Sequence, residues 1–138
     1  MSRARASPPL GSKLPGFAPS GRAKTFASEV VAADLNRDGR PELVFGTYGL
    51  APDSGRLVVL SRTGKKLYDL RLRHQGRDGN GIGIPAAPSI ADIDRDGRLE
   101  IVVTTFDHGI DVYRVPRSNA KSLPWPTGRG NLLRNGAA

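Results

Sequence analysis

Short apolar runs rich in β-branched residues, separated by polar and glycine-containing turns, dominate this chain. Four such runs, each five or six residues long, cover residues 29–33, 41–46, 55–60 and 65–70. Runs of this length, bounded by Gly, Pro, Asp and Asn, are typical of strands rather than amphipathic helices. The turn from Ser61 to Gly64 between the last two runs predicts a hairpin. The pattern therefore predicts four short strands between about residues 28 and 72.

Part of this pattern occurs a second time, 58 residues further along the chain. Residues 33–44 and 91–102 are identical at eight of twelve positions, and three more positions are conservative. Residues 109–113 parallel the start of the third run, so a whole unit is repeated. A unit of nearly 60 residues with about four strands has the size of one β-propeller blade, whereas other common repeats are helical or shorter. The sequence predicts an all-β fold of propeller blades, in two four-stranded antiparallel repeats.

Composition divides the chain into four segments. Residues 1–25 form a basic linker or tail rich in Pro, Gly and Ser, with too little apolar material to build a core. Residues 26–76 and 77–116 are the two blade-like repeats, with a flexible glycine-rich link at 77–83, and residues 117–138 form a C-terminal closing segment. We expect no membrane span and no signal peptide, because no apolar run is long enough for either.

Each repeat contains an acidic loop with the pattern Asp-x-(Asn/Asp)-x-Asp-Gly-x-x-Glu. Side-chain oxygens at positions 1, 3 and 5 can converge on one point, and Gly at position 6 allows a sharp turn. The backbone carbonyl at position 7 and the carboxylate at position 9 can complete the shell. An all-oxygen set suits Ca²⁺ better than zinc or copper. The predicted ligands are Asp34, Asn36, Asp38, Arg40 and Glu42 in loop 1, and Asp92, Asp94, Asp96, Arg98 and Glu100 in loop 2.

Two other interpretations of these loops are weaker. An EF-hand needs a closing acid at position 12, where this chain has Phe45 and Val103, and its flanks are helices rather than strands. A simple turn needs only one or two such residues, so four oxygen donors retained in both copies favour metal binding. We therefore predict two Ca²⁺ sites. Loop 2 has four carboxylates and loop 1 has three, which predicts tighter binding in loop 2.

The segments ADLNRDGRPELVFG and ADIDRDGRLEIVVT resemble FG-GAP/VCBS repeats, the calcium-loop blades of the propeller found in the integrin α-subunit head. The resemblance covers about residues 26–136. It implies six to eight blades, an extracellular, cell-surface or periplasmic location, and a role as an adhesion, ligand-binding or scaffold module for a protein or glycan. Two blades cannot close a ring, so further blades are expected from a longer chain or from self-association.

The sequence predicts no catalytic residue and no site for an organic cofactor. Its acids are largely assigned to the metal loops, and His74 and His108 lack a recognisable nucleophile, so both are predicted to be surface residues. The leading hypothesis is therefore a non-enzymatic module. The alternative, since some related propellers are polysaccharide lyases, is the non-catalytic part of a secreted carbohydrate-active enzyme.

The net charge of +8 first suggests a polyanionic partner. However, residues 1–28 and 112–138 each contain five basic and no acidic residues, whereas residues 29–111 contain 11 basic and 13 acidic residues. The basic charge therefore belongs to the two ends. Aromatic residues make up only 6% of the chain, which leaves few platforms for base stacking. We expect no specific nucleic-acid partner.

Overall fold

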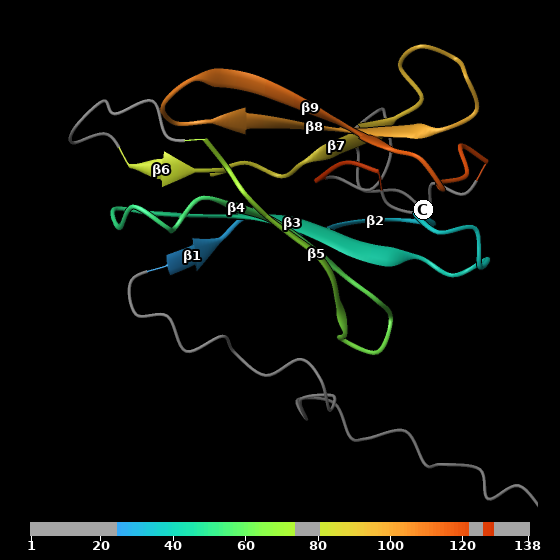
Figure 1. The fold of residues 1–138 in the computed structure, drawn as a ribbon, viewed down its shortest axis with the longest axis horizontal. Coiled ribbons are helices and arrows are strands. Elements are labelled where there is room, and N and C mark those ends of the chain that lie inside the picture. The colour runs from blue at the N-terminus through green and yellow to red at the C-terminus, as the bar shows by residue number, and fades with distance from the viewer. Residues whose placement is uncertain (1–24, 74–80, 122–125, 129–138) are drawn as a thin grey trace, which may run out of the picture.

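All regular structure in the described residues is β-strand (Figure 1). A computed structural model describes residues 25–73, 81–121 and 126–128. The strands are β1 (Thr25–Ala27), β2 (Val31–Ala33), β3 (Glu42–Gly49), β4 (Arg56–Leu60), β5 (Lys66–Arg71), β6 (Ile82–Gly83), β7 (Ser89–Ala91), β8 (Leu99–Thr105) and β9 (Gly109–Val115). They form two antiparallel sheets, one of six strands and one of three. The prediction of an all-β fold is confirmed.

The first sheet is built around β3, the longest strand. β2 pairs with the start of β3, with Val31 opposite Val44, and β1 pairs with its end, with Phe26 opposite Tyr48. β4 pairs along most of β3, and β5 follows β4 in the sheet. The four strands predicted between residues 28 and 72 are thus confirmed as β2, β3, β4 and β5. β1, at the boundary of the segment predicted to be a tail, was not predicted.

The prediction of two four-stranded repeats is wrong in the number of strands in each sheet. β6 lies within the predicted second repeat, but it pairs with the end of β3 in the first sheet. The second sheet therefore contains only β7, β8 and β9 among the described residues, and neither sheet closes. The predicted flexible link ends in this paired strand, where Gly83 has a φ of 112° and a Cβ would lie 2.1 Å from the carbonyl oxygen of Thr47. Residues 74–80 of the link lie outside the described ranges.

The two sheets lie one above the other and enclose one apolar core (Figure 1). The core takes residues from both sheets and from the segments that join them: Val31, Ala33, Leu35, Val44, Leu57, Val59, Leu72, Ile84, Ile90, Leu99, Ile101, Val103 and Val115. A glycine in β3 allows this close packing, because a Cβ on Gly46 would lie 2.2 Å from Cβ of Ile84. Burial of these side chains is the main stabilising contribution to the stack.

The two sheets pack front to back rather than face to face. In the first sheet, the cross-strand pair Val44 and Val59 faces the core, with exposed fractions of 0% and 2%. The corresponding pair in the second sheet is Val102 and Val112, and Val112 is 54% exposed. The second sheet instead buries Ile101 through its opposite face. Both repeats therefore face the same direction, and each side of the stack leaves one sheet face without a neighbour in the described structure.

Further contacts join the two repeats outside the core. The ring of Tyr48 lies edge-on to that of Phe106, with centroids 5.9 Å apart, and Phe106 donates its backbone N–H to the carbonyl of Gly83. From the predicted closing segment, the carbonyl of Pro126 accepts a hydrogen bond from the N–H of Ile90 at 2.9 Å. Most of residues 122–138 lie outside the described ranges. Within the described ranges, the chain has no helix long and apolar enough to cross a membrane.

Candidate metal-binding loops

The two acidic loops lie at the same end of the stack, where loop 1 joins β2 to β3 and loop 2 joins β7 to β8. The segment after β9 connects them. The N–H of Asn119 donates to the carbonyl of Asp34 at 3.2 Å, and the N–H of Ala120 donates to the carbonyl of Gly97 at 3.3 Å. From loop 1, Arg37 Nε donates to the carbonyl of Ser118 at 2.8 Å. The loops are therefore held in a fixed relation to each other by residues 118–120.

The conformation of loop 1 is held by three of its own side chains, which accept hydrogen bonds from backbone N–H groups later in the loop. Asp34 accepts from Asn36 at 3.3 Å and from Gly39 at 3.0 Å. Asn36 Oδ1 accepts from Asp38 at 3.0 Å, and Asp38 accepts from Arg40 at 2.8 Å. Gly39 has a φ of 77°, a conformation that disfavours a Cβ. The side chains at positions 1, 3 and 5, which are three of the predicted ligands, thus each accept a backbone hydrogen bond within the loop.

Glu42 closes loop 1 from the first residue of β3. Its Oε2 accepts the N–H of Leu35 at 2.7 Å, and its Oε1 accepts Asn36 Nδ2 at 3.2 Å. The residue is only 2% exposed. Burial raises the pKa of the Glu42 carboxyl, and the nearby charges of Asp38 and Asp34 raise the pKa further, while the N–H of Leu35 opposes them. A cation in this loop would therefore stabilise a carboxylate that is costly to ionise.

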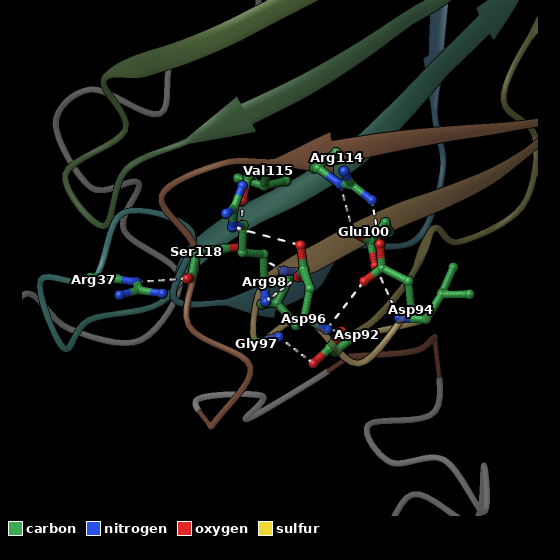
Figure 2. A network of polar contacts seen from close by, with 12 residues as sticks. Arg37, Asp92, Asp94, Asp96, Gly97, Arg98, Glu100, Arg114, Val115 and Ser118 are labelled. Atoms are coloured by element: carbon green, nitrogen blue, oxygen red, sulfur yellow. Dashed lines mark hydrogen bonds and ion pairs between the residues drawn. The ribbon is translucent and has the colours of Figure 1, made fainter.

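Loop 2 repeats this arrangement (Figure 2). Asp92 Oδ2 accepts the N–H of Gly97 at 2.9 Å, as Asp34 does from Gly39. Asp96 accepts from Arg98 at 2.9 Å, and Glu100 Oε2 accepts the N–H of Ile93 at 2.9 Å. Both loops also place an arginine at position 4 in the left-handed region, with φ values of 63° and 62°. Two copies of one sequence pattern have therefore folded into the same local structure.

Loop 2 brings three carboxylates together. Asp92, Asp94 and Glu100 each offer one oxygen within 4.8 Å of the others, and such an all-oxygen set suits a hard cation such as Ca²⁺. Asp96 is outside this group and lies 3.7 Å from Arg98 Nε. Loop 1 has Asp34, Asn36 and Glu42 in the corresponding places, which gives one carboxylate fewer. The predicted ligation by the carbonyls of Arg40 and Arg98 stays a prediction.

Two residues near the loops were not predicted from the sequence. Arg114 of β9 donates through Nε to Glu100 Oε1 at 3.3 Å and through Nη2 to Asp94 Oδ2 (Figure 2). Ser118 is fully buried, and its hydroxyl accepts the N–H of Leu99 at 2.6 Å. A comparison of the repeats does not reveal Arg114, because the corresponding position after β4 is Ser61. The cross-strand pairing of Arg114 with Glu100 is what identifies it.

A second polar cluster lies at the turn between β8 and β9, at the opposite end of these strands. His108 Nδ1 lies 2.9 Å from Asp107 Oδ1, and His108 Nε2 lies 2.8 Å from Asp111 Oδ2. Tyr113 also donates its hydroxyl to Asp111, at 3.2 Å. The prediction that His108 is a surface residue is wrong, because its side chain is only 11% exposed. His74 lies outside the described residues.

No protein-family profile matches this chain, and no match was found among curated proteins or solved structures. The two loops and the stacked sheets are therefore the basis for a functional assignment.

Proposed function

We propose that this chain is a non-enzymatic calcium-binding module of a β-propeller. One Ca²⁺ ion in each loop fixes the connection between two strands, and the rigid stack then presents a surface to a protein or glycan ligand. The main support is the duplication of the acidic loop, in sequence and in hydrogen bonding, as described for Asp34 and Asp92. The resemblance to FG-GAP/VCBS repeats supports the same function.

Electrostatics favour a bound cation over a purely structural turn. Three carboxylate oxygens within 4.8 Å repel one another, and this repulsion is reduced when a divalent cation lies between them. A turn alone would be served by the Asp and Gly at positions 1 and 6. The additional acids at positions 3 and 9, here Asp94 and Glu100, add negative charge beside Asp92, and Ca²⁺ binding would reduce the resulting repulsion.

The front-to-back packing of the sheets supports the propeller. Because both repeats face the same direction, a further sheet of the same kind can be added on either side in the way that the second sheet packs on the first. Val112 is 54% exposed and Ile110 is 66% exposed, and both lie on the sheet face that such a neighbour would cover. We propose six to eight blades in total, supplied by a longer chain or by self-association.

The type of loop also bears on location. Calcium sites in extracellular modules have dissociation constants of about 0.1 to 1 mM, so they are filled outside the cell and largely empty in the cytosol. A structural role for Ca²⁺ in these loops is therefore consistent with an extracellular, cell-surface or periplasmic protein. This location is part of the proposal.

Calorimetric titration and thermal unfolding test the proposal directly. We expect two Ca²⁺ ions to bind, and we expect EDTA to lower the melting temperature. Asp34→Ala and Asp92→Ala should each remove one binding event, whereas Glu29→Ala, at an exposed position outside the loops, should remove neither. An unchanged melting temperature with EDTA, together with no heat of Ca²⁺ binding, would refute the calcium function.

A further inference from the structure

The carboxylates of loop 2 are already in contact with a cation of the protein itself. Arg114 lies opposite Glu100 in the pairing of β8 and β9, and its guanidinium reaches two members of the three-carboxylate group. Nε donates to Glu100 Oε1 at 3.3 Å, and Nη2 donates to Asp94 Oδ2, while Asp92 stays outside this contact (Figure 2). Two of the three carboxylates are thus already paired with a positively charged group.

Within the described part of the chain, no arginine or lysine makes the corresponding contact with loop 1. Leu43 pairs with Leu60 as Ile101 pairs with Tyr113, so the position that corresponds to Arg114 is Ser61, the residue after Leu60. In loop 1, the Oε1 atom of the closing glutamate accepts instead from the neutral side-chain amide of Asn36. The two loops are therefore alike in backbone and closing contact, but among the described residues only loop 2 has a cationic side chain from another strand against its ligands.

We propose that Arg114 is a built-in competitor of Ca²⁺ at loop 2. The guanidinium neutralises Asp94 and Glu100 in the calcium-free protein, and Ca²⁺ must displace it from these oxygens in order to bind. This inference rests on the proposed calcium function. The side chain of Arg114 is 53% exposed, so it can swing into solvent without disturbing the core.

This competition changes the expected order of the two sites. The number of carboxylates alone predicts tighter binding in loop 2, because it offers four against three in loop 1. Arg114 opposes that order, since Ca²⁺ binding at loop 2 must break two charged hydrogen bonds before the new contacts form. We expect loop 2 to bind clearly more tightly than loop 1 only when Arg114 is replaced.

The test measures each loop separately by calorimetric titration with CaCl₂. Asp34→Asn disables loop 1, and Asp92→Asn disables loop 2, each with a side chain of the same size. In the Asp34→Asn chain, adding Arg114→Ser should increase the Ca²⁺ affinity of loop 2 by about three- to tenfold. The serine is the residue that the first repeat has at this position. In the Asp92→Asn chain, Arg114→Ser should change the affinity of loop 1 by less than about twofold.

A control for charge alone is Arg71→Ser. Arg71 pairs with Arg56, at the end of the strands away from the loops, and its guanidinium contacts the carbonyl of Pro52. This variant removes the same charge as Arg114→Ser but no contact with the loops, so the affinity of loop 2 should stay unchanged. An equal increase in both variants would show a general charge effect and would overturn the competition.

Thermal unfolding gives a second readout, because Arg114→Ser should affect the melting temperature differently without and with Ca²⁺. Without calcium, Arg114→Ser leaves Asp94 and Glu100 without their cation, so the melting temperature should fall. The rise in melting temperature on adding Ca²⁺ should then be larger than in the unsubstituted chain. If Arg114→Ser leaves the affinity of loop 2 unchanged or lowers it while Ca²⁺ still binds, the competition is refuted and the calcium function stands. If no variant binds Ca²⁺, both proposals fail.

Discussion

The carboxylate of Glu42 accepts a hydrogen bond from the backbone N–H of Leu35, seven residues earlier, at a distance of 2.7 Å. Glu100 and Ile93 repeat this contact in the second loop at 2.9 Å. The bond ties the start of each following strand, the first residue of β3 and the second of β8, back to the second residue of each loop. The closing glutamate therefore stabilises the loop whether or not a metal is bound, and this role can be separated from ligation.

Replacing Glu42 should destabilise the protein even in EDTA. Glu42→Ala leaves the buried N–H of Leu35 without an acceptor, which should reduce the free energy of unfolding by about 1 to 3 kcal/mol. Glu29→Ala, at an exposed position, should change it by less than about 0.5 kcal/mol. Urea unfolding of the calcium-free proteins gives both values. Equal stability of the two variants would mean that the contact with Leu35 contributes nothing.

Two glycines should respond differently to replacement by alanine. Gly39 has a φ of 77° and open space around its missing Cβ, so Gly39→Ala should cost only about 1 kcal/mol of backbone strain. Gly46 has no room, because its Cβ would lie 2.2 Å from Cβ of Ile84, and Gly46→Ala should cost about 3 kcal/mol or more. Denaturant unfolding of the two variants compares them. A larger loss for Gly39→Ala would contradict this ranking.

Val59 and Val112, which occupy corresponding positions in the two sheets, can show whether a further sheet covers the stack in solution. Val59→Ala removes methyl groups from the core and should reduce the free energy of unfolding by about 2 kcal/mol. Val112→Ala should cost less than about 0.5 kcal/mol if the chain is a two-sheet monomer, because Val112 is 54% exposed. Unfolding at several protein concentrations, with sedimentation, gives the measurement. A cost for Val112→Ala close to that for Val59→Ala in an associated state would show that the open face is covered.

Stability should depend on pH through His108. The hydrogen bond to Asp111 raises the pKa of His108 despite its burial, and the bond to Asp107 raises the pKa further. The charged His108 therefore contributes stability that is fully present below its unfolded pKa of about 6.5 and is lost as pH rises through its folded pKa. The stability difference between the unsubstituted chain and His108→Gln should shrink as pH rises from about 5.5 to 8.

The neighbouring tyrosine supplies the control for that measurement. Burial and the charge of Asp111 raise the pKa of Tyr113 to about 12, far above the pH range of the experiment. Tyr113→Phe removes the hydroxyl that donates to Asp111 but leaves the histidine in place. Its stability difference from the unsubstituted chain should be nearly constant across that range. A difference that varies with pH as strongly as for His108→Gln would mean that the titrating group is not His108.

Local sequence was sufficient for strands β2, β3, β4 and β5 and for the loop conformation. Apolar runs of strand length predict the strands. The loop conformation depends on contacts of Asp34 and Asp92 with N–H groups of their own loops, and these contacts span only a few residues. The same reasoning failed for β6 and His108. β6 is two residues long and pairs with β3 across more than 30 residues of sequence, which no local pattern encodes.

The sequence by itself determined that this protein is all-β, that a unit with an acidic loop occurs twice, and which acidic and amide side chains those loops contain. Tertiary structure decided the rest. Three features join segments that are distant in the chain. They are the front-to-back stacking of the sheets, the hydrogen bonds from residues 118–120 to both loops, and the contact of Arg114 with Asp94 and Glu100. Such contacts depend on strand register and sheet packing, and these are set by burial of the whole core rather than by neighbouring residues.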